Sequence, residues 1–165
     1  MRIAPCCLAC ALLALGAGVP VGTPEASSGL STSISSMATS FFEGSGASKV
    51  LFNLSGGKFF KGSGGSTVLV NISGDRILDG SGSSKQVANV SGQKLFEGSG
   101  GSKVLFNRQG NMIYRGSGGG TVAYNLRGNT LFEGSGGSKV VTNWSGGSLS
   151  DAELFAVVWL LENRV

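Results

Sequence analysis

A tandem repeat of 18 residues constrains this chain more than any other feature of its sequence. Six copies follow one another without insertion from residue 41 to residue 148. Residues 95–112, LFEGSGGSKVLFNRQGNM, give a representative copy. A unit this short has too few apolar side chains to fold alone, so it must bury them against neighbouring copies. The repeats therefore predict one folded domain over residues 41–148.

Each copy holds two apolar segments separated by glycine-rich sequence. We number the positions of a copy 1–18, so that Leu95 stands at position 1. Positions 1 and 2 are apolar in every copy, positions 4–8 read GSGGS or close to it, and positions 9–14 form a second segment before another glycine turn. Short apolar runs bounded by glycine turns are typical of β-strands. We therefore expect two short strands per copy and an all-β domain.

Two arrangements of these strands fit the pattern. One is a short β-solenoid with two strands per coil, in which six coils stack about 4.8 Å apart. The alternative is an antiparallel meander or closed barrel of about twelve short strands, because the glycine turns also suit hairpins. Position 13 is asparagine in every copy, and stacked amides form a ladder that stabilises a solenoid. We therefore favour the solenoid, with a ladder of Asn53, Asn71, Asn89, Asn107, Asn125 and Asn143.

Positions 3 and 9 vary together in charge. Four copies have an acid at position 3 and lysine at position 9, as in Glu97 with Lys103. In the other two copies position 3 is basic, at Lys61 and Arg115, and position 9 is threonine. Two facing cations would repel each other, so we expect the two positions to face each other across the glycine-rich turn.

An outward apolar stripe is the first candidate interaction surface. Neighbouring residues on a strand point to opposite faces. Position 11 is aliphatic in all copies, whereas position 14 accommodates Arg108, so we assign positions 11 and 13 to the interior. This assignment leaves Phe52, Phe106 and Tyr124, at position 12, on the outside as a candidate surface for dimerisation or partner binding.

A row of serines at position 5 is the second candidate surface. Regularly spaced hydroxyl groups suit a sugar polymer or an ice lattice, although serines also commonly satisfy the backbone of turns. The row consists of Ser45, Ser63, Ser81, Ser99, Ser117 and Ser135.

The sequence offers little for catalysis or for cofactors. It contains no histidine, so no serine has the usual base to activate it. The glycine-rich runs lack the lysine of a phosphate-binding loop. The net charge of +4 is spread along the chain, without the basic cluster of a nucleic-acid-binding protein. We expect no enzymatic activity, cofactor, metal or nucleic acid.

Asparagine sequons leave one modification open. Asn53, Asn71, Asn89 and Asn143 each stand in an N-x-[ST] sequence, which is a glycosylation acceptor when it is exposed in a eukaryotic secretory route. The same asparagines belong to the expected ladder, so both interpretations stay open.

The first 40 residues have the composition of a targeting segment and a linker. Residues 1–18 carry Arg2, an apolar run through Leu15 and small residues after it, which is the layout of a signal peptide. The run is too short to cross a bilayer. Residues 19–40 are rich in Ser, Thr, Gly and Pro and are expected to form a linker. We predict a secreted or periplasmic protein without a transmembrane segment in its mature form; a cytoplasmic protein is the alternative.

The last 17 residues, 149–165, are predicted to form a capping helix. Ser150 has the properties of an N-cap, and Glu153 completes a capping box with it. The helix that follows is apolar on most sides and needs a buried position. We expect it to cover the open end of the stack.

The repeats resemble those of a group of mostly bacterial proteins with the pattern [VIL]-[YF]-x-G-x-S-x-x-S-x-[VI]-L-[YF]-[NT]-[VIL]-x-G. The similarity runs from Phe41 to about Leu161, with departures at Gln86, Ala88 and Arg108. It implies a β-repeat fold, and it implies no activity or functional residues. The expectation is therefore a non-enzymatic secreted structural or interaction protein, whose partner is a protein or a polysaccharide and which could form homo-oligomers. The alternative is a carbohydrate- or ice-binding surface on the serine row.

Overall fold

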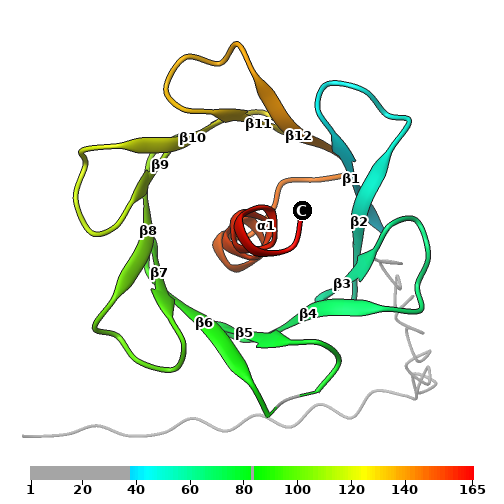
Figure 1. Cartoon of the computed structure of the whole chain (residues 1–165), viewed down its shortest axis with the longest axis horizontal. Coiled ribbons are helices and arrows are strands. Elements are labelled where there is room, and N and C mark those ends of the chain that lie inside the picture. The colour runs from blue at the N-terminus through cyan, green and yellow to red at the C-terminus, as the bar shows by residue number, and fades with distance from the viewer. Residues whose placement is uncertain (1–37, 83) are drawn as a thin grey trace, which may run out of the picture. The chain divides into compact units, whose positions relative to one another are not determined.

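The computed structural model describes residues 38–82 and 84–165. Twelve strands form a closed antiparallel barrel, and one helix lies inside it (Figure 1). Each copy of the repeat supplies two strands, one of four or five residues and one of six. The strands are β1 (Thr39–Glu43), β2 (Val50–Ser55), β3 (Lys58–Lys61), β4 (Val68–Ser73), β5 (Arg76–Asp79), β6 (Gln86–Ser91), β7 (Lys94–Glu97), β8 (Val104–Gln109), β9 (Met112–Arg115), β10 (Val122–Arg127), β11 (Thr130–Glu133) and β12 (Val140–Ser145).

Every strand pairs with its neighbours in the sequence, and β12 pairs with β1 to close the ring. The solenoid prediction is therefore wrong, and the twelve-strand barrel that we kept as the alternative is confirmed. The short turns explain the outcome. Gly56 and Gly57 join β2 to β3 with φ angles of 56° and 74°. Two successive residues with positive φ make the tight turn that directs a strand back along its neighbour.

A β-bulge in each longer hairpin decides which side chains face the interior. In the first hairpin Phe41 pairs with Phe52 and Phe42 with Val50, so that Leu51 is an extra residue. Such a residue breaks the strict alternation of faces. Position 12 is consequently buried in the core, as at Phe52 with 0% exposure, and the partly buried Leu51 also packs against the core.

The predicted apolar stripe on the outer face is therefore wrong. Phe52, Phe106 and Tyr124 lie in the core with exposures between 0% and 7%. Among the described residues, Val165 is the exposed large hydrophobic side chain, so the barrel wall offers no apolar patch to replace the stripe. The prediction that position 11 faces inward agrees with the packing of Leu51, whereas position 13 is turned away from the core.

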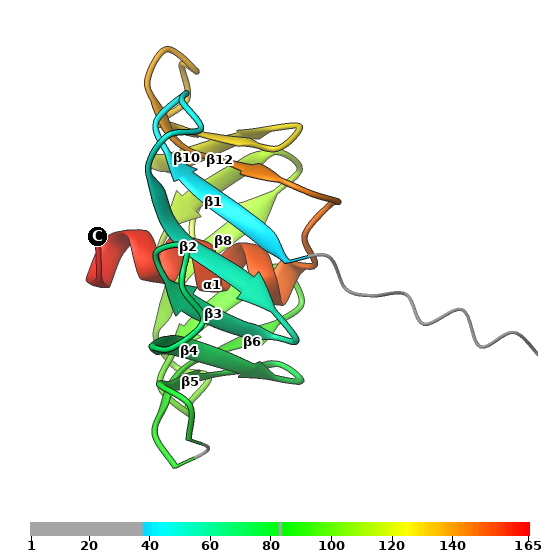
Figure 2. The same ribbon diagram turned by 90° about the vertical axis from the view of Figure 1, so that its right-hand side faces the viewer.

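Helix α1 (Asp151–Asn163) runs through the barrel rather than across its end (Figure 2). Seven consecutive residues, from Leu154 to Leu160, are buried. Seven residues cover every side of a helix, so the barrel wall surrounds α1. A barrel of about eight strands can be filled by its own side chains, whereas a wider one leaves a lumen. The prediction that the helix caps the open end is therefore wrong, because its apolar surface fills this lumen.

The start of α1 follows the sequence prediction. Ser150 Oγ accepts a hydrogen bond from Glu153 N at 3.3 Å, and Ser150 N donates to Glu153 Oε2 at 2.8 Å. These two bonds form the predicted capping box.

The first strand begins slightly before the predicted domain. Thr39 and Ser40, which we assigned to the linker, belong to β1. The predicted signal peptide and the rest of the linker lie outside the described residues, so both stay predictions. The described part of the chain contains no helix with the length and apolar character needed to cross a membrane.

Candidate functional site

The two ends of the barrel differ. One end carries the short turns. The other carries six longer loops, which spread outward around the C-terminal end of α1 (Figures 1 and 2). We call these six loops the loop rim. Their described residues are 44–49, 62–67, 80–82, 84–85, 98–103, 116–121 and 134–139.

The asparagines at position 13 hold the loop rim in place. Asn53 Nδ2 donates to Gly62 O at 3.1 Å and to Gly64 O at 3.2 Å, both in the loop of the next copy. Asn143 makes the same contacts with the first loop, to Gly44 O at 2.7 Å and Gly46 O at 2.9 Å. An amide NH₂ group can donate twice, and asparagine provides it on a short side chain. We call each such contact an asparagine clamp.

The clamps correct the predicted ladder. Asn71 and Asn107 likewise donate to two loop carbonyls, and Asn125 donates to Ser135 O. The amides bond to backbone of the next copy and not to one another. The sequence pattern is the same for a ladder and for a clamp, because both need one asparagine at a fixed position in every copy.

One clamp is replaced. Asn89 Oδ1 is buried without a hydrogen-bond partner among the described residues. Gln86, which departs from the repeat pattern, donates instead from Nε2 to Gly98 O at 3.0 Å. A glutamine on the same strand thus binds the carbonyl that asparagine binds in other copies.

The serines at position 5 are all exposed on the loop rim. They lie around a ring, because the loops spread outward from the barrel (Figure 1). The carbohydrate- or ice-binding alternative for these serines stays a prediction. Their hydroxyl groups face solvent at six repeated places.

The predicted pairs between positions 3 and 9 are confirmed. Glu97 pairs with Lys103 at 2.7 Å and Glu133 with Lys139 at 2.5 Å. The other two pairs are Glu43 with Lys49 and Asp79 with Lys85. Position 3 shares a strand face with the inward position 1, so these side chains encircle the mouth of the barrel inside the loop rim.

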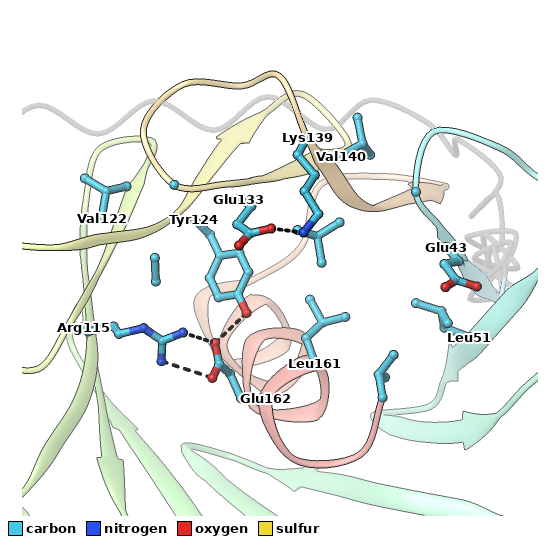
Figure 3. A pocket seen from close by; sticks show the side chains of 15 residues that line it. Glu43, Leu51, Arg115, Val122, Tyr124, Glu133, Lys139, Val140, Leu161 and Glu162 are labelled. Atoms are coloured by element: carbon cyan, nitrogen blue, oxygen red, sulfur yellow. Dashed lines mark hydrogen bonds and ion pairs between the residues drawn. The ribbon is translucent and has the colours of Figure 1, made fainter.

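Arg115, the basic residue at position 3 of the fifth copy, bonds to the helix. Its Nη1 and Nη2 atoms donate to Glu162 Oε2 at 3.1 Å and Oε1 at 2.6 Å, and Tyr124 OH donates to Oε1 at 2.6 Å (Figure 3). No sequence pattern predicts this contact, because Arg115 and Glu162 lie 47 positions apart in different elements. Arg115 is therefore paired, although position 9 of its own copy is Thr121 and not an acid.

The three groups shift one another's pKa values. Burial alone would raise the pKa of Glu162, but the hydrogen bonds from Arg115 and Tyr124 and the charge of Arg115 lower it. Burial, followed by the hydrogen bond to Glu162, raises the pKa of Tyr124 well above its ordinary value. The hydrogen bond to Glu162 likewise raises the pKa of Arg115. The cluster therefore holds a carboxylate, a neutral phenol and a guanidinium at neutral pH.

Two further ion pairs join α1 to the wall. Arg108 Nη1 lies 2.5 Å from Asp151 Oδ1 at the start of the helix. Arg164 Nη2 lies 2.7 Å from Asp79 Oδ1 near its end. Position 14 is buried in several copies, as at Leu54, so our interpretation of Arg108 as a mark of a solvent-facing position is wrong. Its charge is accommodated by the pair with Asp151.

A pocket of about 750 Å³ opens between the end of α1 and the wall formed by β10–β12, β1 and β2 (Figure 3). The helix lies closest to β4, β5 and β6, which leaves space on the opposite side. Ala123 enlarges this space, because position 11 carries leucine or valine in the other copies. Aliphatic side chains lie at its base, and charged side chains surround its opening.

A second pocket, of about 650 Å³, lies between α1 and the strands of the third to fifth copies. Val87, Phe106 and Trp159 contribute to its lining. Arg115 and Glu162 line both pockets, so this ion pair lies between them. Within the described ranges no cluster of three or more Cys, His, Asp or Glu side chains is arranged to hold a metal ion.

Comparison with known proteins gives one match. A family model described as "6-fold beta flower protein" matches residues 41–157. No curated protein and no solved structure matches the chain. The match covers all six copies of the repeat and most of α1, which supports the expected tandem β-repeat family.

Proposed function

This chain belongs to the 6-fold beta flower protein family, and we propose that it is a secreted, non-enzymatic interaction protein that binds a partner protein through the loop rim. The observation that carries the proposal is that six loops of similar sequence lie exposed at one end of the barrel. The asparagine clamps support it, because loops held in one conformation lose little entropy when they bind.

The two other parts of the barrel are less suited to binding. The lumen is occupied by α1, whose residues Leu154 to Leu160 are buried. The outer wall, as described, lacks exposed large apolar side chains. Interfaces generally need such a cluster or a set of well-placed polar groups. The loop rim supplies the latter.

The chemistry of the loop rim favours binding over catalysis. The sequence has no histidine, and the four acids at position 3 are paired with lysines of the loops that follow them. Each of these carboxylates is paired with a lysine and not with a second carboxylate, and a pair of carboxylates is the arrangement that glycoside hydrolysis needs.

A protein partner is favoured over a polysaccharide. The six loops consist of Gly, Ser, Ala, Thr and Lys and contain no aromatic residue on which a sugar ring could stack. Their exposed backbone and hydroxyl groups suit hydrogen bonding to another protein surface. A polysaccharide that binds several equivalent loops at once stays the alternative.

The proposed location depends on the first residues of the chain. The expected signal peptide at residues 1–18 and the resemblance to mostly bacterial repeat proteins support a periplasmic or extracellular protein. Self-association through the loop rim is a further form of the same proposal, with a second copy as the partner.

A pull-down with matched variants tests the proposal. Ser63, Ser99 and Ser135 on the loop rim are changed together to Glu, and a control protein carries the same change at Ser73, Ser91 and Ser145 near the short turns; all six are exposed. A partner captured by the wild-type and the control protein, but lost with the loop-rim variant, supports the proposal. Equal capture by both variants contradicts it. If the wild-type and control proteins are retained on a polysaccharide resin and the loop-rim variant is not, the polysaccharide alternative is favoured.

A further inference from the structure

We infer that the pocket beside the end of α1 binds an organic cation with an aliphatic body, such as a primary alkylamine. The inference concerns the pocket enclosed by the loop rim and not the loops themselves. It therefore goes beyond the proposed function and does not depend on a protein partner.

The size and base of the pocket suit a small aliphatic group. The volume of about 750 Å³ lies within the range of small-molecule sites. Leu51, Val141 and Leu161 contribute aliphatic side chains to the lining, and Ala123 provides room between them. Tyr124 is the aromatic residue of this lining, and its hydroxyl group is bonded to Glu162. The pocket thus lacks the aromatic cage that a quaternary ammonium group requires.

The charges that are fixed around the pocket favour a cation. Glu43 and Glu133 extend inward from strand positions, and Glu162 extends from the helix. The cations of the lining are Arg115, which is bonded to Glu162, and Lys139, which is paired with Glu133. Three carboxylates therefore face the pocket with one guanidinium and one loop lysine.

The lysines that pair with Glu43 and Glu133 can be displaced. Lys49 and Lys139 start from the loops, and their side chains are 69% and 75% exposed. Exposed ion pairs of this kind contribute little free energy. An ammonium group that enters the pocket can take the place of either lysine, whose own amino group then returns to water.

The helix adds to the preference for positive charge. The C-terminal end of a helix carries a partial negative charge from its unpaired carbonyl groups. The last turn of α1 contains no basic residue. Arg164, which follows, is paired with Asp79 on the other side of the barrel. A ligand cation in the pocket would therefore lie near the negative end of the helix.

Two ligands with the same aliphatic body and opposite charge test the inference. The full-length protein is titrated with hexylammonium and with hexanoate, and binding is followed by backbone amide shifts in NMR spectra. We expect hexylammonium to shift the amides of Leu51, Ala123 and Val141, and hexanoate to leave them unchanged. Equal or tighter binding of hexanoate, or amide shifts confined to other parts of the barrel, would overturn the inference.

Two variants with matched controls locate the site. Ala123→Leu fills the base of the pocket with the side chain that Leu51 provides in the first copy, and its control, Val87→Leu, changes the same position beside the other pocket. Glu133→Gln removes one carboxylate, with Glu97→Gln as the control at position 3 of the fourth copy. We expect each pocket variant to weaken hexylammonium binding by about tenfold, the scale of one charged hydrogen bond, and each control to leave it unchanged. If both members of each pair behave alike, the pocket is not the site.

Discussion

The Arg115 guanidinium and the Glu162 carboxylate form a two-pronged ion pair, with N to O distances of 2.6 and 3.1 Å. The pair joins β9 to the last turn of α1, and Tyr124 from β10 donates to the same carboxylate. One acid on the central helix thus connects it to two neighbouring strands.

We expect Glu162→Gln to lower the free energy of unfolding by about 1 kcal/mol, since it removes the charge from a partly exposed pair of hydrogen bonds. Urea denaturation measures the change. The control is Glu97→Gln, which breaks an ion pair with Lys103 on the loop rim and should cost less than about 0.5 kcal/mol. Equal losses for the two variants would show that Glu162 does not tie the helix to the wall.

The contribution of Glu162 should disappear in acid. Its folded-state pKa lies below the ordinary value of 4.5. A carboxyl group of this kind stabilises the folded state above its unfolded-state pKa and loses the contribution as the pH falls through the folded-state pKa. We expect the difference in stability between wild type and Glu162→Gln to be constant from about pH 7 to about pH 5, and to shrink at lower pH. A difference that grows on acidification would contradict the assignment.

The asparagine clamp that closes the ring should be as strong as the others. Asn143→Ala removes two hydrogen bonds between the last and first copies, and Asn53→Ala removes the equivalent two between the first and second. We expect each variant to lose about 1–2 kcal/mol of unfolding free energy, because the loop carbonyls lose their protein donors. The exposed Ser45→Ala should change it by less than about 0.5 kcal/mol. A much smaller loss for Asn143→Ala would mean that the closure between β1 and β12 is weaker than the other contacts between copies.

The contribution of each α1 side chain to stability should follow how deeply that side chain is buried. Phe155 is fully buried in the lumen, and we expect Phe155→Ala to destabilise the protein by about 3–5 kcal/mol through the cavity it leaves. Leu161 borders the open pocket and is only partly buried. Leu161→Ala should therefore cost less than about 2 kcal/mol. Thermal and urea denaturation compare the two variants. If both lose a similar free energy of unfolding, Phe155 is less tightly packed than its full burial indicates.

The features that local sequence determines were predicted correctly. The glycine turns gave two strands per copy, and Ser150 and Glu153 gave the start of α1. The covariation of positions 3 and 9 predicted the pairs such as Glu97 with Lys103, since both residues lie in one hairpin. Each of these features depends on residues that are close in the chain.

The features that depend on ring closure were not predictable in the same way. The bulge at Leu51 changes the face of Phe52, although a single sequence shows no difference between a bulged and a regular strand. Arg108 looked like an isolated departure from the repeat, and Arg115 looked like a change of charge within one hairpin, because the partners of both belong to α1. The position of the helix follows from the width of the barrel, which the number of strands determines only once the ring is known to close.

The fit between α1 and the lumen sets the number of copies that this fold accepts. Tandem repeats gain and lose units readily, and a solenoid accommodates such changes by growing or shrinking at its end. A closed ring cannot, because its diameter rises with each added pair of strands. Fewer copies would narrow the lumen around α1, and more copies would widen the pockets that already lie beside it. The single helix thus selects a barrel of six copies, although the pairing of one copy with the next does not itself limit their number.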